Sequence, residues 1–269
     1  MSKLTDVSET LFVPMEGRVY SSRNCPKFFY DSKALEIYEN LPENLKSKFE
    51  QDEYTYIASA MRSKNLDLYI KDFLNENPEG SIINLGCGME SLYERNDNQK
   101  ANWFELDFPE VLKLRKNYLP PKTRDNYLPY SMFDYAWIDE VKKISDKSKL
   151  IIAAGLFHYF EEEQIVEFIN NLQKIAPAYL VFDAVSTFGL KQSQKYMKKM
   201  NREDALMYFS VDDPNYLINK CSSNIKLLRM EKYYKYANYN SNLKFSTKIK
   251  MKVSDIFNMV KMIYLKIES

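Results

Sequence analysis

The stretch Ser81-Ile82-Ile83-Asn84-Leu85-Gly86-Cys87-Gly88 decides the fold of this 269-residue chain. Its apolar run predicts a buried strand, and the two glycines that follow predict a tight turn at the end of that strand. Such a turn can approach a ligand closely, because glycine has no Cβ to stand in the way. The whole chain contains only six glycines, so a pair at the end of a strand indicates a specific demand on the backbone.

A carboxylate lies at a meaningful distance from this turn. Residues 103–106 form a second apolar segment, and Asp107 follows it. An acidic residue about 20 positions after such a glycine turn can bind both hydroxyls of a ribose. Ser91 stands where a dinucleotide site would need its third glycine, and the chain contains no P-loop motif. The pattern therefore suits an adenosine ligand without pyrophosphate, such as S-adenosylmethionine, while a strand-to-helix turn without a ligand stays open on the glycines alone.

Strands alternate with helices after residue 80, which predicts a doubly wound α/β fold with a mostly parallel, Rossmann-like sheet. Strands are expected at 81–85, 102–106, 126–131, 149–154, 178–183 and 225–234, and helices at 31–38, 56–74, 109–118, 161–175 and 213–221. We predict one domain over residues 1–269. In it, residues 1–79 form a helical cap, 80–184 a nucleoside-binding core, and 185–269 an insertion, the last strands and a C-terminal helix.

Three segments outside the core carry weaker patterns. Residues 7–21 are expected to form a short amphipathic stretch broken by Pro14 and Gly17. Residues 191–202 show no regular periodicity. Residues 253–267 space their apolar side chains at helical intervals, so we expect a helix docked on the domain, with a membrane-surface helix as the alternative.

Composition excludes several classes of protein. The 38 basic and 37 acidic residues give a net charge of +1, which argues against nucleic-acid binding. The three scattered cysteines are typical of free thiols in a reducing compartment. A single histidine excludes a His-rich metal site, and we predict no metal. Without a leader-like N-terminus or a run of 18 apolar residues, the chain is expected to be soluble and cytoplasmic.

The motifs around the predicted strands resemble those of the leucine carboxyl methyltransferase superfamily, which is a class I S-adenosylmethionine-dependent group. Residues 83–90, I-N-L-G-C-G-M-E, resemble its V-N-L-G-x-G-L-D signature, and residues 103–111, W-F-E-L-D-F-P-E-V, resemble its second motif. Residues 131–137 and 154–163 are similar to the third and fourth motifs. Two further segments resemble the branch of tetracenomycin-type polyketide O-methyltransferases: Glu9-Thr10-Leu11 and Asp212-Asp213-Pro214.

The resemblance covers about residues 8–240 and implies a methyltransferase that converts S-adenosylmethionine to S-adenosylhomocysteine. The implied acceptor is the oxygen of a small aromatic or polyketide-like molecule. Three alternatives stay open: carboxyl methylation of a protein C-terminus, a non-catalytic S-adenosylmethionine-binding protein, and a nicotinamide oxidoreductase. The acceptor, the regiochemistry and the oligomeric state are left undecided by the sequence.

Ligands of open α/β sheets bind outside the carboxyl ends of the strands, and this rule selects the first candidates. Gly86 and Gly88 should leave backbone room for the methionine and ribose parts of the cofactor. Asp107 should hold the ribose hydroxyls by charge-assisted hydrogen bonds. Ser131 and Met132 follow the third strand, where the adenine is expected, with a simple turn as the alternative.

Two further candidates follow from the resemblance and from the chemistry. The family places an arginine at Arg62 to pair with the cofactor's carboxylate, a task that suits a planar guanidinium. It also carries an arginine at the position of Arg95, which we interpret as structural, with a role in cofactor binding as the alternative. His158 lies at the mouth of the fourth strand, and a histidine there can act as general base for a phenol or enol acceptor. If proximity alone drives the reaction, His158 is dispensable.

The chain departs from the family pattern at three positions. Ala154 stands where the family has a glutamate that binds the cofactor's amino group; Glu90 and Leu92 replace an aspartate and an arginine. We expect backbone carbonyls near Gly86 and Gly155 to meet the ammonium instead. Aromatic side chains are expected to line the acceptor site, namely Phe12, Tyr20, Phe28, Phe29, Tyr30, Phe188, Tyr196, Tyr208 and Phe209.

Overall fold

The computed structural model describes residues 3–46, 52–199, 207–221 and 224–268. Their centre is a seven-stranded sheet of order β3-β2-β1-β4-β5-β7-β6. The strands are β1 (Ser81–Leu85), β2 (Asn102–Leu106), β3 (Asp125–Leu128), β4 (Lys149–Ala153), β5 (Ala178–Val185), β6 (Ile225–Lys232) and β7 (Val260–Ile267). The first five run parallel, and β7 pairs antiparallel with β5 and β6. The predicted doubly wound, mostly parallel α/β sheet is therefore confirmed.

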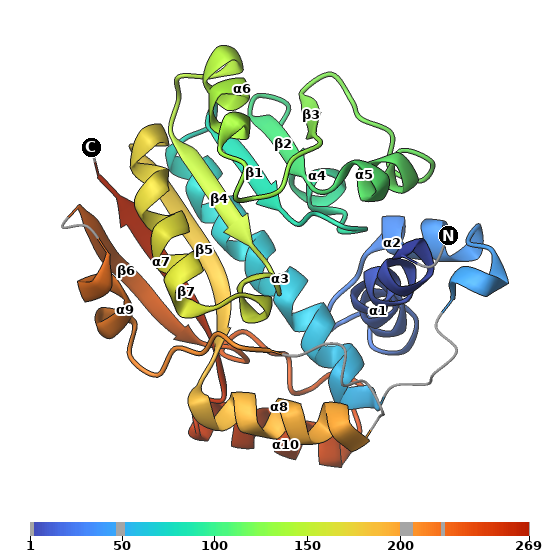
Figure 1. Cartoon of the computed structure of the whole chain (residues 1–269). Coiled ribbons are helices and arrows are strands. Elements are labelled where there is room, and N and C mark those ends of the chain that lie inside the picture. The colour runs from blue at the N-terminus through green and yellow to red at the C-terminus, as the bar shows by residue number, and fades with distance from the viewer. Residues whose placement is uncertain (1–2, 47–51, 200–206, 222–223, 269) are drawn as a thin grey trace.

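Helices cover both faces of this sheet (Figure 1). One face packs against α6 (Ala136–Ile144) and α7 (Glu162–Asn171), and the other packs against α3 (Glu53–Glu76) and α4 (Leu92–Asn96). Because successive side chains of a strand point to opposite faces, Ile83 joins the first core and Ile82 the second. All five residues of β1 are buried, as its apolar run requires.

The remaining elements lie around this core. They are α1 (Lys3–Asn24), α2 (Ser32–Glu39), η1 (Glu43–Leu45), α5 (Pro109–Arg115), η2 (Phe157–Tyr159), η3 (Leu172–Ile175), α8 (Thr187–Lys199), α9 (Pro214–Lys220) and α10 (Phe245–Ile256). The predicted helix start at Asp31 is confirmed, since its carboxylate accepts the backbone N–H of Ala34 at 2.9 Å. Among the described residues, no helix is long and apolar enough to cross a membrane.

The expected break near Pro14 and Gly17 is wrong, because α1 runs through both residues. A proline inside a helix removes one backbone hydrogen bond, but apolar side chains on either side of Pro14 are buried in the cap. Gly17 brings α1 close to α3, since a Cβ there would stand 2.6 Å from the Cβ of Ser59. Tertiary packing thus outweighs the local signal.

The segment 191–202, expected to lack regular structure, lies in α8 as far as Lys199; its last three residues fall outside the described part. The start of α8 is fixed from far away in sequence. The backbone N–H of Thr187 donates to Asp212 Oδ1 at 2.9 Å, and the Thr187 hydroxyl donates to Oδ2 at 2.6 Å. Periodicity within the segment could not reveal this partner.

The expected C-terminal helix over 253–267 is also wrong. α10 ends at Ile256, and Val260–Ile267 form strand β7 between β5 and β6. A short apolar run fits a buried strand and a buried helix equally well by periodicity. Its burial on both faces, between two neighbouring strands, decides for the strand.

Candidate active site at the carboxyl ends of the strands

Two glycine bends stand where the strand order reverses. β1 and β4 are neighbours, and the chain winds outward from them in opposite directions, which makes the crevice between them the switch point of the sheet. Gly86 follows β1 and Gly155 follows β4, each with φ of +60°. Gly88 has φ of +49°. These left-handed conformations suit glycine, and they leave bare backbone at the edge where such folds bind ligands.

Asp107 follows β2, as predicted, and lies against the first bend; its binding of ribose hydroxyls stays a prediction. Its Oδ2 accepts the N–H of Gly88 at 2.8 Å, and its Oδ1 accepts the N–H of Phe108 at 2.8 Å. Burial raises the pKa of this carboxyl above its usual value, although the two N–H donors lower it. An ionised carboxylate has about four acceptor positions, so both oxygens keep capacity for ligand hydroxyls.

Arginines hold the carbonyls of the loop after β1. Arg115 Nη1 donates to the carbonyls of Gly88 at 2.9 Å and of Glu90 at 2.6 Å. Arg18 Nη2 donates to the carbonyl of Met89 at 2.7 Å. Because Arg18 belongs to α1, this contact joins the N-terminal helices to the glycine loop.

Glu90 and Arg95 complete the support of this loop. Glu90 pairs with Arg18 at 2.7 Å and with Arg95 at 2.9 Å. Burial alone would raise the pKa of Glu90, but the two guanidinium groups bring it below its usual value. Arg95 also pairs with Asp31 and Asp67. Three carboxylates therefore engage Arg95, which is the arrangement that a structural role requires.

A second polar cluster lies at the ends of β4 and β5 around Asp183, a residue that sequence reasoning missed. Asp183 Oδ2 pairs with Arg62 Nη2 at 2.9 Å and lies 3.3 Å from His158 Nε2, while Oδ1 accepts the N–H of Gly155 at 2.6 Å. Only 1% of its side chain is exposed. Burial would raise the pKa of Asp183, but Arg62 and His158 hold it well below its usual value. Asp183 is the last residue of a predicted strand. The rule that ligands bind at the carboxyl ends of the strands, which selected Asp107, therefore also selects Asp183.

His158 is buried in η2 with one free ring nitrogen. Its Nε2 faces Asp183, and its Nδ1 has no hydrogen-bond partner within the described part of the chain. Its carbonyl accepts the N–H of Tyr208 at 2.7 Å, which fixes the backbone. A histidine oriented by a carboxylate on one side and free on the other can accept a proton.

Arg62 lies between this cluster and the second bend. A Cβ on Gly155 would stand 2.8 Å from Arg62 Nη1, so glycine is needed for the guanidinium to lie here. The expected pairing of Arg62 with a cofactor carboxylate stays a prediction. In the structure, its Nε and Nη2 are engaged by Asp183.

Ser131 and Met132 lie in the turn beyond β3, which ends at Leu128 rather than at residue 131. The hydroxyl of Ser131 accepts the N–H of Phe133 at 3.3 Å. Met132 is buried, and its carbonyl accepts the indole N–H of Trp137 at 3.1 Å. Their expected contact with an adenine stays a prediction.

The aromatic side chains expected to line an acceptor site differ in their exposure. Phe12, Phe28, Phe29 and Phe209 are buried, and core packing accounts for them. Tyr20 stacks on Tyr56. Tyr30, Phe188 and Tyr208 are exposed, and the side chain of Tyr196 lies outside the described part.

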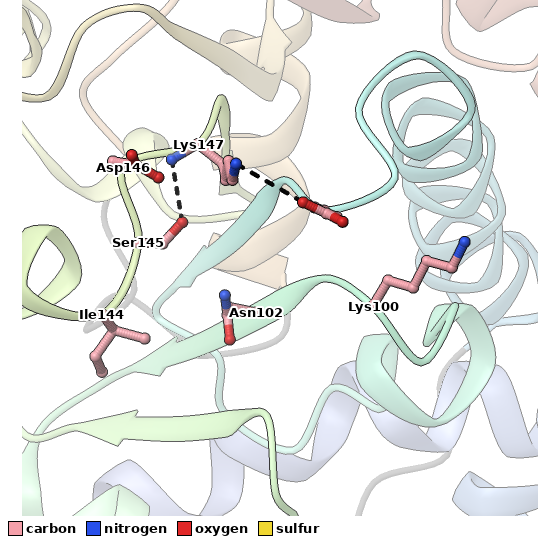
Figure 2. A pocket seen from close by; sticks show the side chains of 7 residues that line it. Lys100, Asn102, Ile144, Ser145, Asp146 and Lys147 are labelled. Atoms are coloured by element: carbon pink, nitrogen blue, oxygen red, sulfur yellow. Dashed lines mark hydrogen bonds and ion pairs between the residues drawn. The ribbon is translucent and has the colours of Figure 1, made fainter.

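Surface hollows lie elsewhere on the described part of the molecule. One, of about 290 Å³, lies at the amino ends of the strands between Glu79, Lys100 and the 144–147 segment (Figure 2). Another, of about 170 Å³, lies on α1 beside Tyr38 and Tyr56. At the carboxyl edge itself, Leu156 and Leu11 cover the bends, since Cβ atoms on Gly86 and Gly88 would stand 3.0 and 3.1 Å from them.

The residues at the carboxyl ends of the strands fit S-adenosylmethionine at its ribose and at its methionine part. The bends have no side chain of their own, although Leu156 and Leu11 lie over them, and the Asp107 carboxylate stands beside the first bend. Ala154 offers no carboxylate to an amino group, but buried Asp183 lies against the next residue, Gly155. Within the described residues, no cluster of three or more His, Cys, Asp or Glu side chains could hold a metal ion.

Solved structures share this fold. A DUF574 family protein from Streptomyces avermitilis superposes with a TM-score of 0.60 at 13% identity, covering 93% of this chain and 96% of that one. The plantazolicin methyltransferase BamL, in complex with a desmethyl analog and S-adenosylhomocysteine, superposes with a TM-score of 0.53 at 10% identity, covering 98% of both chains. Magnesium protoporphyrin IX methyltransferase from Synechocystis, with bound S-adenosylhomocysteine, superposes with a TM-score of 0.51 at 11% identity. The superposition covers 94% of this chain and 98% of that one. The fold is that of S-adenosylmethionine-dependent methyltransferases.

Sequence comparison gives the family. The family model of leucine carboxyl methyltransferase matches residues 17–173, and the chain belongs to this family. The tetracenomycin polyketide synthesis O-methyltransferase TcmP of Streptomyces glaucescens is 25% identical over 217 residues, which are 80% of this chain and 79% of TcmP. The S-adenosylmethionine-dependent methyltransferase dpfgK of Gibberella zeae is 23% identical over 182 residues, which are 63% of this chain and 61% of dpfgK. The chain is an S-adenosylmethionine-dependent methyltransferase, as predicted.

Proposed function

We propose that the chain transfers the methyl group of S-adenosylmethionine to an oxygen of a small aromatic or polyketide-like molecule. The observation that carries this proposal is buried His158, with Nε2 beside Asp183 and Nδ1 free. A hydroxyl acceptor must lose a proton during methylation, whereas a carboxylate acceptor needs no base. The similarity to TcmP, which is named as a polyketide O-methyltransferase, supports the same class of acceptor.

The chain's own residues would divide the work of binding. The cofactor would lie against the backbone of Gly86, Gly88 and Gly155 once the side chains of Leu11 and Leu156 move aside, and Asp107 would bind its ribose hydroxyls. Asp183 supplies the carboxylate that Ala154 lacks. Asp183 would then bind the amino group of the cofactor, either in place of the backbone carbonyls near Gly86 and Gly155 or together with them. Arg62 provides the positive charge for the cofactor's carboxylate.

The bound cofactor supplies a methyl group on a sulfonium, and the protein supplies alignment and proton transfer. His158 takes the proton of the acceptor hydroxyl, and Asp183 stabilises the imidazolium that forms. Arg62 balances the charge of Asp183, which keeps this carboxylate ionised. Leu11 and Leu156, which cover the bends, exclude water from the reacting atoms.

The test is transfer of labelled methyl to a panel of phenols, enols and carboxylic acids by the wild type and by His158→Gln. We expect kcat for hydroxyl acceptors to fall by about 10²–10⁴-fold in the variant, because a general base contributes that factor. Affinity for S-adenosylmethionine, measured by calorimetry, should stay within twofold. Tyr159→Phe, at the exposed neighbour of His158, is the control and should match the wild type.

Other outcomes would reject the proposal in distinct ways. An unchanged kcat in His158→Gln would show that proximity suffices and that His158 is no base. Label entering protein rather than the panel compounds would indicate the carboxyl methyltransferase function. Cofactor binding without turnover on any acceptor would indicate a non-catalytic binding protein.

A further inference from the structure

Helix α10 presents most of its large apolar side chains to solvent, whereas Met251 is its one buried apolar side chain and lies between two small polar ones. Thr247, Met251 and Ser254 are its buried residues. The exposed apolar residues recur every three to four positions on the opposite side, and the exposed fractions are Phe245 78%, Ile249 44%, Val253 39%, Ile256 67% and, just after the helix, Phe257 60%. At about 100° per residue, they form one continuous stripe along the helix. We call this stripe the α10 face.

Specific polar contacts fix this inverted orientation. Glu53 at the start of α3 accepts the hydroxyl of Thr247 and, at 2.9 Å, the backbone N–H of Lys244. Both donors lie at the N-terminal end of α10. At its other end, the Ser254 carbonyl accepts the N–H of Met259 at 2.8 Å. The outward turn of the apolar stripe is therefore built into the fold.

Helix α8 extends the α10 face. The ring of Phe188, which is 48% exposed, lies 6.0 Å from the ring of Phe257. The backbones approach closely beside this pair, since a Cβ on Gly189 would stand 2.3 Å from the carbonyl oxygen of Met259. Figure 1 shows α8 and α10 together along one edge of the molecule. A soluble monomer rarely gathers so many large apolar side chains on one exposed surface without a partner.

Lysines border this apolar surface. α10 carries Lys248, Lys250 and Lys252, and α8 carries Lys191 and Lys195 on the same side as Phe188, three and seven positions after it. The only acidic residue of α10 is Asp255, which is half-buried and accepts the N–H of Tyr234. Lys250 pairs with Asp52 at 2.5 Å, and the other four lysines concentrate positive charge locally on a chain whose net charge is only +1.

We propose that the α10 face and Phe188 dock on the surface of an anionic phospholipid bilayer. An apolar stripe flanked by lysines is the pattern of a helix that lies in a membrane interface. The rings and aliphatic side chains would enter the boundary between headgroups and acyl chains, and the lysines would contact the phosphates. A second copy of the chain would bring like-charged lysines together, which disfavours self-association through this face.

The test is co-sedimentation of the full chain with vesicles of phosphatidylcholine alone and with 30% phosphatidylserine. We expect at least tenfold tighter binding to the anionic vesicles, weakened by added salt. The triple variant F245S/I256S/F257S should lose at least tenfold in affinity. K248Q/K252Q should lose roughly 30-fold on anionic vesicles, because each lysine near the surface contributes a factor of about five.

The control is Y216S/M230S, which removes two exposed large side chains outside α8 and α10, Tyr216 at 60% and Met230 at 49%, and should bind as the wild type does. Thermal unfolding verifies that each variant is folded. Equal binding to both kinds of vesicle, or none to either, overturns the proposal. So does a concentration-dependent dimer in sedimentation velocity that disappears in F245S/I256S/F257S, since the occupant would then be a second copy. None of these readouts depends on methyl transfer, so failure here leaves the proposed function standing.

Discussion

The carbonyls of residues 88–90 are all bound by guanidinium groups, two by Arg115 and one by Arg18. Backbone N–H groups of the same loop therefore point away from these arginines, and Asp107 accepts the one from Gly88. These contacts hold the loop in its bent shape. Such preorganisation reduces the conformational entropy that binding would otherwise cost.

Asp107→Ala should weaken binding of S-adenosylmethionine by about 1.5–3 kcal/mol, because charged hydrogen bonds to the ribose hydroxyls would be lost. Isothermal titration calorimetry measures the change directly, as an increase in Kd of about 10- to 150-fold. Asp139→Ala, at an exposed position on α6, should bind as the wild type does. Equal affinity of Asp107→Ala and wild type would remove Asp107 from the cofactor site.

Asp183→Asn should lower the free energy of unfolding at pH 7 by up to about 3 kcal/mol, because it leaves Arg62 without its buried partner. The folded-state pKa of Asp183 is depressed below its ordinary value of 3.8, so the unfolded state binds more protons in that range. The contribution is therefore complete above about pH 4 and is lost as pH falls through the depressed pKa. Urea unfolding from pH 7 to pH 2 should show the two proteins converging in acid.

Asp72→Asn is the matched control, since it breaks the exposed ion pair with Arg229, where both side chains are more than a third exposed. That change should cost less than about 1 kcal/mol. A constant difference between Asp183→Asn and wild type across the whole pH range would contradict an ionic role for Asp183.

Some site residues were readable from the sequence and others were not. The places of Gly86, Gly88 and Asp107 at the ends of two strands were predictable, because their spacing is set by one strand, one turn and the next strand; their contact with the cofactor stays a prediction. Asp183 also ends a predicted strand, but its partners Arg62 and His158 lie 121 and 25 positions away in the sequence, and no local pattern marks their pairing. The contact of Arg18 with Met89 spans 71 positions and leaves no local signal.

Among the elements, the five parallel strands were predictable and the last strand was not. β1, β4 and most of β5 are buried on both faces, so each reads as a short apolar run bounded by turn residues. β7 is equally buried, but it follows a helix with similar apolar spacing, and the sequence does not mark the change of period. Only the pairing of β7 with β5 and β6 distinguishes this strand from a continuation of the helix.

Helices α1 and α3 approach each other closely at Gly17. Gly17→Ala should lower the free energy of unfolding by about 1–3 kcal/mol, the range for overpacking, although alanine favours helix more than glycine does. The new Cβ would stand 2.7 Å from the carbonyl oxygen of Tyr56, and a backbone atom cannot move aside by rotating a side chain. Urea unfolding measures the change, with exposed Lys71→Ala as a neutral control. A more stable Gly17→Ala would show that α1 does not pack this closely.

At the scale of the whole molecule, the N-terminal helices share a core with the sheet. Cys25, Phe28 and Phe29 lie in the same buried cluster as Ile82 and Trp103. Arg18 also binds the loop after β1. The division into a cap, a core and a C-terminal part therefore gives the sequence order of the segments and does not separate independent folding units. We expect the cap and the core to unfold as one unit.

Thiol labelling tests this coupling, because Cys25 lies in the cap and Cys87 lies in the glycine loop, and both are buried. In increasing urea, mass mapping should show the two thiols becoming reactive at the same midpoint, together with the change in tryptophan fluorescence. S-adenosylmethionine at 100 times its Kd should stabilise both by about 2.7 kcal/mol and slow their labelling by about 100-fold. Cys221 is only partly buried and should react first, as an internal control. If Cys25 reacts at lower urea than Cys87, or gains no protection from the cofactor, the cap opens on its own, and the contacts of Arg18 do not couple it to the site.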